Sequence, residues 1–336
     1  MGRKVTISDI AMAAGVSIAT VSRVLNQPEV VKKATIQKVY RAMQDSGFEG
    51  LSNVYQPSII GTSTPQKLIL IIVPNLSNPF YSQIIDGIQD SALRQQFHCI
   101  IYQSKNTSFT AESLCSLVAD THAAGLILLD PMTDEVMLKK LNTVIPTVQC
   151  AEYVANCNVS YVSIDDSAAG KSLVEFMISR GKRRIALING PLRFKYARLR
   201  REGYLAALKE ANIPVDNSLI INLPEINFAS AFSVVTQLLN SNNPPDSCFA
   251  VSDILAAAAV KAAKWCNLRI PEDFGVVGFD NTYVSTVCDP SITTVNQPCY
   301  QMGFLSCELL SEKIADPFAP AKQMLLETEL IIRDSL

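Results

Sequence analysis

The sequence predicts an N-terminal all-α helix-turn-helix headpiece followed by an α/β core of two doubly wound, Rossmann-like lobes. Two short helical stretches joined by a glycine come first in the chain. From residue 67, apolar runs of strand length alternate with helical stretches in two successive series. The chain of 336 residues is too long for one ordinary domain, and its 48% apolar and 18% charged residues are typical of a soluble globular protein.

Composition argues against several other classes of protein. No apolar run approaches the ~20 residues that cross a bilayer, and no secretory signal begins the chain, so we expect a cytoplasmic protein that contacts no membrane. The nine cysteines form no CxxC pair, and His98 and His122 are not spaced as metal ligands. This pattern predicts reduced core thiols and neither a metal nor a cofactor. Without a nucleophile motif, we expect no catalytic residue and no enzyme activity.

Charge is distributed unevenly along the chain. Residues 1–50 carry seven basic and four acidic side chains, a local net charge of +3, whereas the whole chain has a net charge of −2. The remaining residues, 51–336, therefore carry a net charge of −5. A basic head on an acidic body indicates that the head binds a polyanion and the body does not.

The first two predicted helices form a helix-turn-helix unit. The first helix has a capping box, in which Thr6 caps and Asp9 reaches back, and Gly15 ends it. Ser17 then caps a second helix over about 18–25. Two short helices joined by a tight turn with glycine are typical of this unit.

A third helix and a linker complete the N-terminal region. The third helix is predicted over about 34–46, and Lys32 stands where its N-cap is expected. Residues 1–50 therefore form the predicted headpiece. Residues 51–66 have no basic side chain and include Pro57, which opposes helix formation, so they form the predicted linker.

The core, residues 67–336, is predicted to form two lobes. We expect the first lobe to span about 67–164 with about 297–322, and the second about 165–296 with the C-terminal segment. Ligands of such sheets bind beyond the carboxyl ends of the strands, so the cleft between the lobes is the predicted binding site. The predicted strands are 68–73, 97–102, 126–129, 145–149, 159–164, 184–188, 218–222, 248–251 and 275–279.

Three segments of the headpiece resemble the DNA-binding headpiece of the LacI/GalR family. They are Val5–Ala11, Ala14–Ser17 and Thr20–Asn26. The core resembles the same family over its whole length, and also resembles periplasmic sugar-binding proteins. Within the family it is most similar to the cytidine-repressor subset, through segments such as 78–82 and 278–281.

The resemblance implies a ligand-responsive repressor that binds a palindromic DNA operator as a homodimer. The second helix would enter the major groove, where Arg23 can contact guanine in bidentate fashion and the apolar Ile18 and Ala19 can meet thymine methyl groups. The candidate DNA-binding residues are Thr6, Ser17, Ile18, Ala19, Thr20, Ser22, Arg23, Asn26 and Lys32.

Side chains at or just past the ends of predicted strands are the candidate effector contacts. Phe80 and Tyr81 follow the first strand and can stack on a flat ring or a sugar face. Asp165 and Asp280 follow later strands and suit the hydroxyl or amine groups of a neutral polar ligand. The candidate set is Phe80, Tyr81, Glu152, Asp165, Arg200, Phe228, Ser252 and Asp280.

Arg200, Phe228 and Ser252 need a further reason for their selection. Arg200 matches the effector-binding arginine of the family. Ile226 stands where many relatives place an aromatic platform, so stacking comes either from Phe228 or only from the aromatic pair that follows the first strand. Ser252 follows a strand, and the adjacent Asp253 is expected to cap the next helix.

Several alternatives remain at this point. The effector is predicted to be a nucleoside or a sugar. The linker has no basic residue and includes Pro57, so it differs from the hinge expected from the family resemblance. This difference predicts weaker intrinsic DNA affinity, which favours help from a second DNA-bound regulator. The competing functions are a cytoplasmic solute-binding protein and a DNA-binding regulator whose effector pocket is no longer used. A helical hairpin for protein–protein contact is the alternative interpretation of the N-terminal region.

Overall fold

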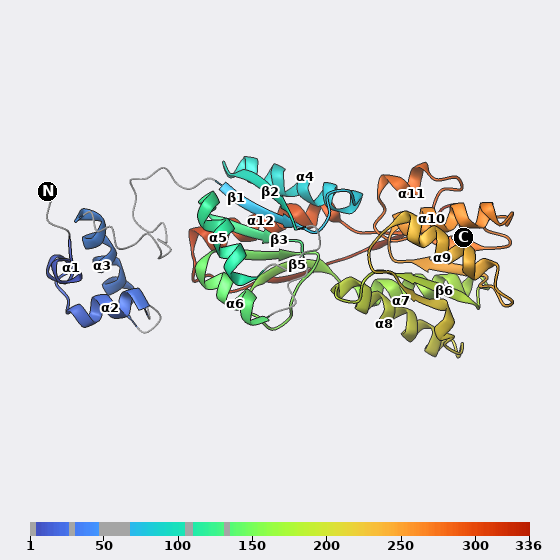
Figure 1. The fold of residues 1–336 in the computed structure, drawn as a ribbon, viewed down its shortest axis with the longest axis horizontal. Coiled ribbons are helices and arrows are strands. Elements are labelled where there is room, and N and C mark those ends of the chain that lie inside the picture. Colours follow the sequence, from blue (N-terminus) through green and yellow to red (C-terminus); the bar gives the residue numbers. More distant parts are fainter. Residues whose placement is uncertain (1–4, 27–30, 47–67, 105–109, 131–134) are drawn as a thin grey trace. The chain divides into compact units, whose positions relative to one another are not determined.

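The computed structural model describes residues 5–26, 31–46, 68–104, 110–130 and 135–336. The chain divides into two units, residues 1–66 and residues 67–336 (Figure 1). The predicted linker, residues 51–66, lies outside the described residues. In the described part, no single helix is long and apolar enough to cross a membrane, and one bent pair, Ile7–Ala14 with Ile18–Val24, meets the criteria by length and composition.

The headpiece consists of three helices around a small apolar core. The predicted capping box is present, because Thr6 Oγ1 accepts a hydrogen bond from the Asp9 amide while the Asp9 carboxylate accepts from the Thr6 amide. Gly15 ends the first helix in the left-handed conformation, with φ of 65°. The helices are α1 (Ile7–Ala14), α2 (Ile18–Asn26) and α3 (Lys33–Asp45). Their buried core is Ile10, Ala11, Val21, Val24, Val39, Ala42 and Met43.

The first lobe is built on a six-stranded sheet whose neighbouring strands all pair in parallel. Strand β1 is buried on both faces: Ile69 and Ile71 pack into one apolar cluster and Leu70 and Ile72 into another. Such a continuous apolar run is what a central parallel strand requires. In spatial order the strands are β11 (Gln323–Leu326), β5 (Ser160–Ile164), β4 (Thr147–Cys150), β3 (Gly125–Leu128), β1 (Leu68–Val73) and β2 (His98–Gln103).

Two pairs of helices cover this sheet. Helices α4 and α12 approach closely because both carry glycine at the contact: a Cβ atom at Gly87 would lie 2.0 Å from the Tyr300 carbonyl oxygen, and one at Gly303 would lie 1.9 Å from the Ile84 oxygen. The second pair contributes to the cluster that contains Leu70. The helices are α4 (Pro79–Arg94), α5 (Ala111–Thr121), α6 (Glu135–Val144) and α12 (Cys299–Ala315).

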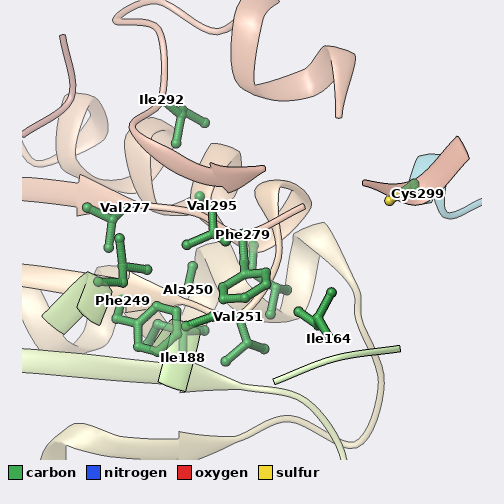
Figure 2. Close-up of a cluster of buried hydrophobic side chains, with 14 of the residues drawn as sticks. Ile164, Ile188, Phe249, Ala250, Val251, Val277, Phe279, Ile292, Val295 and Cys299 are labelled. Carbon is green, nitrogen blue, oxygen red and sulfur yellow. The ribbon is translucent and has the colours of Figure 1, made fainter. Parts of the chain in front are cut away.

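The second lobe contains a four-stranded parallel sheet in the order β7-β6-β8-β9. Phe249 and Phe279 pack in its core with ring centroids 6.4 Å apart, beside Val277 (Figure 2). The strands are β6 (Ile185–Asn189), β7 (Ile220–Asn222), β8 (Ser247–Ala250) and β9 (Gly275–Val277). The helices are α7 (Asp166–Ser179), α8 (Lys195–Glu210), α9 (Phe228–Leu239), α10 (Asp253–Trp265) and the short α11 (Tyr283–Val287).

The C-terminal part of the first lobe extends further along the chain than expected. Strand β11 pairs with β5 in the first lobe, one strand beyond the expected limit at about residue 322. Its side chains alternate between exposed and partly buried, as those of the other edge strand β2 do, whereas β3 and β5 are buried throughout. Strands β10 (Thr294–Asn296) and β12 (Glu329–Ile331) then form an antiparallel pair of their own.

Candidate functional site

Helix α2 presents a mixed face of apolar, polar and basic side chains to solvent. Val21 and Val24 are fully buried in the headpiece core, which fixes the rotation of the helix. Ile18 is therefore 56% exposed, and Ala19 and Arg23 are exposed beside it. An exposed helical face with one arginine and small neighbours has the shape that enters a major groove.

The other candidate DNA contacts have local structural roles as well. Ser17 Oγ accepts a hydrogen bond from the Thr20 amide at 3.1 Å, so it caps α2 as predicted. Thr6 caps α1, and Ser22 is exposed on α2. Lys32 is exposed, and its carbonyl oxygen accepts the first hydrogen bonds of α3. The side chain of Asn26, also a candidate, lies outside the described residues.

A cavity lies between the two lobes of the core. It encloses about 790 Å³ of empty space, including solvent at its mouth. Its lining combines aromatic side chains with buried charged groups, as is common for small-molecule sites. Six of the eight candidate effector residues line it: Phe80, Tyr81, Glu152, Arg200, Ser252 and Asp280. Other lining residues include Asn75, Asn78, Asp166, Arg193, Phe194, Tyr196, Glu225, Ile226 and Gln297.

Asp165 does not line this cavity, contrary to expectation. It is exposed and caps α7, where its carboxylate accepts a hydrogen bond from the Ala168 amide at 2.9 Å. The next residue, Asp166, is 2% exposed and lines the cavity instead. Two adjacent aspartates at a strand end face different directions, and the sequence alone gave no reason to choose the second.

Phe228 also lies outside the cavity lining. It is the first residue of α9, is 39% exposed and faces the Lys261 ammonium, whose nitrogen is 6.0 Å from the ring centroid. Asn227 caps this helix, and Ile226, one residue before the cap, lines the cavity. Aromatic surface comes from Phe194 and Tyr196 in addition to the pair that follows β1.

Arg200 is the centre of a buried ion network. Its Nε atom donates to Asp166 Oδ1 at 2.8 Å, and its Nη1 atom donates to the Val251 carbonyl at 2.7 Å and to Asp280 Oδ1 at 3.4 Å. The guanidinium also lies 3.5 Å from the centroid of the Phe279 ring. Burial acts to raise the pKa of Asp166, but Arg200 and Lys195 hold it below its ordinary value.

Asp280 connects this network to the segment that leads from β10 to α12, where the chain crosses to the first lobe. Its Oδ1 atom accepts a hydrogen bond at 2.7 Å from Gln297 Nε2, and its backbone has a left-handed φ of 106°. Burial, with the nearby Asp253 charge adding to it, raises the pKa of Asp280 to about 8. Asp253 does not cap α10: Ser252 does, and Asp253 accepts hydrogen bonds from Thr282 and Thr294.

Glu152 is the buried acidic group of the first lobe in this cavity. One of its oxygens accepts from the Lys195 amide at 2.6 Å and the other from the Tyr196 amide at 3.1 Å. These amides begin α8, which belongs to the second lobe. Burial raises the pKa of Glu152, while Lys195 opposes this shift.

Sequence reasoning missed Asp166, Lys195, Tyr196 and Gln297. Lys195 Nζ donates to Asp166 Oδ2 at 2.6 Å and to Ser163 Oγ at 3.0 Å, so it is an integral member of the buried network. Lys195 and Tyr196 come shortly after the end of strand β6. The rule that selected the other candidates, that functional groups follow strand ends, could therefore have found them. Across the described ranges, no group of three or more His, Cys, Asp or Glu side chains could hold a metal ion.

Comparisons with known proteins agree with this architecture. The family of bacterial regulatory proteins named lacI matches residues 6–49, and a periplasmic binding protein-like domain matches residues 174–336. The HTH-type transcriptional repressor CytR of Escherichia coli (strain K12) is 30% identical over 334 residues, which are 98% of this chain and 96% of CytR.

Two similar solved structures are complexes of related proteins with their ligands. The complex of the transcriptional regulator CelR with cellobiose has a TM-score of 0.73 and 29% identity, and covers 99% of this chain and 100% of that one. The lac repressor dimer bound to operator and the anti-inducer ONPF has a TM-score of 0.71 and 25% identity, and the match covers 99% of each chain.

A helix-turn-helix headpiece joined to a two-lobed core with a cavity defines the class of ligand-responsive, DNA-binding transcription regulators. The chain belongs to the lacI family within that class. The predicted fold class is thereby confirmed.

Proposed function

We propose that this protein represses transcription by binding a near-palindromic operator as a homodimer, and that a small effector between the lobes changes its operator affinity. The observation that carries the proposal is the cavity, because Asp280 of the second lobe is hydrogen-bonded there to Gln297, where the chain crosses between the lobes. A ligand bound among these groups would favour one lobe arrangement over another. The protein would act in the cytoplasm, as a binding protein without enzyme activity.

The exposed face of α2 would read the operator. Arg23 would donate two hydrogen bonds to one guanine, and Ile18 and Ala19 would contact thymine methyl groups. Thr6, Ser17, Thr20, Ser22, Asn26 and Lys32 would contact phosphates or base edges and set the register. A single headpiece buries too little surface for specificity, so two would bind together.

The core lobes would form the dimer. Leu93 at the end of α4 is 76% exposed, and Ile100 is 37% exposed on β2, the edge strand of its sheet. Tyr283 and Val287 on α11 are 67% and 73% exposed. Apolar side chains exposed in both lobes favour burial against a second copy. The operator complex of the lac repressor is itself a dimer.

The effector would be a nucleoside or a sugar. Phe80, Tyr81 and Tyr196 offer aromatic faces, while Asp280 and Arg200 offer polar groups for hydroxyl or amine contacts. The resemblance to the cytidine-repressor subset favours a nucleoside, and the cellobiose complex of CelR favours a sugar. The linker without basic residues favours a second DNA-bound regulator as a further partner.

A thermal-shift screen followed by a DNA-binding titration tests this proposal. Nucleosides, nucleobases, monosaccharides and disaccharides would be added to the full chain, and a compound that binds the native state raises the unfolding midpoint with concentration. We expect a hit that also changes operator affinity in wild type but not in Asp280→Ala. A hit that leaves operator affinity unchanged would contradict the coupling.

A further inference from the structure

We propose that Glu152 is a built-in anion that caps helix α8 across the lobe boundary and restricts the cavity to uncharged ligands. This inference rests on the proposed function, because it concerns the same effector cavity. It names the chemical class of the effector and assigns the selectivity to one carboxylate.

The first support is the geometry of helix α8. The amides of Lys195 and Tyr196 are the first two of the helix and therefore have no acceptor within it. Phe194, at the N-cap position, provides no side-chain hydrogen bond. The two oxygens of Glu152 accept from these amides at 2.6 and 3.1 Å, so a residue of the first lobe performs the capping.

The backbone before Glu152 directs it toward this helix. Ala151 adopts a left-handed φ of 65°, which is unfavourable for a residue with a Cβ atom. Its carbonyl oxygen accepts a hydrogen bond from Ser163 Oγ at 2.6 Å, and that hydroxyl in turn accepts from Lys195 Nζ at 3.0 Å. The turn that presents Glu152 is thus held within the first lobe by Ser163, and Ser163 itself bonds to Lys195 of the second lobe.

The charges around the cavity explain why a second anion is disfavoured. The end of a helix with free amides is where anions bind, and the Glu152 carboxylate, 5% exposed, occupies this end of α8. The buried cations Lys195 and Arg200 are both paired with Asp166. Arg193 is exposed. A phosphate group entering the cavity would meet the Glu152 carboxylate where it needs donors.

The cap is tested by amide hydrogen exchange in the ligand-free full chain. In wild type, the amides of Lys195 and Tyr196 should be protected although they lie in the first turn of a helix. Glu152→Ala should speed their exchange about 10-fold or more, because each loses its only acceptor. Glu225→Ala removes an exposed carboxylate from the same cavity and should leave both rates unchanged. Equal exchange in wild type and Glu152→Ala would overturn the inference.

Anion exclusion is tested with inorganic phosphate as the probe. The unfolding midpoint would be measured against phosphate concentration, with chloride at matched ionic strength as the reference. Wild type and Glu225→Ala should show no phosphate-specific rise, whereas Glu152→Ala should show one because its α8 amides are free. Glu152→Gln, which keeps the size of the side chain but not its charge, provides a second variant and should show a smaller rise.

Each outcome of the phosphate titration decides the question. A phosphate-specific rise in wild type equal to that of Glu152→Ala would show that the carboxylate excludes nothing. No rise in either would show that exclusion, if present, does not depend on Glu152, and would equally contradict the inference. Neither readout uses DNA or an effector, so failure here is distinguishable from failure of the proposed function.

Discussion

The headpiece and the interlobe cavity place their functional groups in opposite ways. In the headpiece, a few buried residues such as Val21 and Val24 orient one helix so that neighbouring residues of the same segment face outward. In the core, Glu152, Arg200 and Asp280 come from distant parts of the chain and converge inward. A site on one helix depends on local pattern, whereas a convergent site depends on how two sheets are brought together.

The largest expected effect is a loss of stability when the buried ion network of the core is disrupted. Arg200→Met removes a buried guanidinium that donates to Asp166, Asp280 and the Val251 carbonyl, and leaves Lys195 as the remaining cation beside Asp166. Breaking such a buried pair costs about 3–5 kcal/mol of unfolding free energy. Calorimetry of the full chain should show a lower midpoint for the core transition. Arg198→Met, an exposed position on the same helix, should change the midpoint little. Equal stability of the two variants would mean that the Arg200 network does not stabilise the second lobe.

The next largest effect concerns the outward-facing site. Arg23→Ala should weaken specific operator binding by 1–3 kcal/mol per headpiece, about 5- to 150-fold, without changing the core midpoint. Arg41→Ala, an exposed position on α3, should weaken specific and non-specific DNA binding to the same degree. Titrations of cognate and scrambled duplexes at fixed salt measure both. Unchanged discrimination in Arg23→Ala would remove α2 as the reading helix.

The pH dependence of stability distinguishes the buried site from the exposed one. Because the pKa of Asp280 is raised from 3.8 to about 8, the folded state holds a proton between these values that the unfolded state has released. Core stability should therefore fall as pH rises through this window, by at most about 1.4 kcal/mol per pH unit from this group. Chemical denaturation across the window should show a flatter slope for Asp280→Asn. A slope unchanged in that variant would assign the effect to another group.

The smallest expected effect is confined to the headpiece. Thr6→Ala removes the side-chain half of the capping box and should destabilise the headpiece by about 1 kcal/mol. Amide exchange in α1 should become faster, while exchange in α4 and α8 stays the same. Faster exchange in all three helices would indicate that the two units unfold together.

Much of the fold was predictable because the signals are local. The capping box, Gly15 and the apolar run 68–73 each specify an element from a few neighbouring residues. The strand β11 was missed because it is an edge strand of only four residues, and its partner β5 is about 160 residues away.

The cavity was predictable only in part. Strand ends indicated five of its residues and the family resemblance indicated Arg200, but a one-residue difference separates the exposed Asp165 from the buried Asp166. In the same way, Ile226 lines the cavity and Phe228, two residues later at the start of α9, does not. The contact of Lys195 with Ser163 depends on the approach of the two lobes, and that of Gln297 with Asp280 joins residues 17 positions apart, so no local pattern encodes either.

Selection of bound sequences from a random duplex library by the full chain tests the central claim most directly. We predict that wild type enriches a near-palindromic motif with two half-sites and that Arg23→Ala does not enrich it. Mass measurement of the selected complex should give two chains per duplex. Absence of an enriched motif in wild type, or the same motif in both proteins, would contradict the assignment of α2 as the operator-reading element.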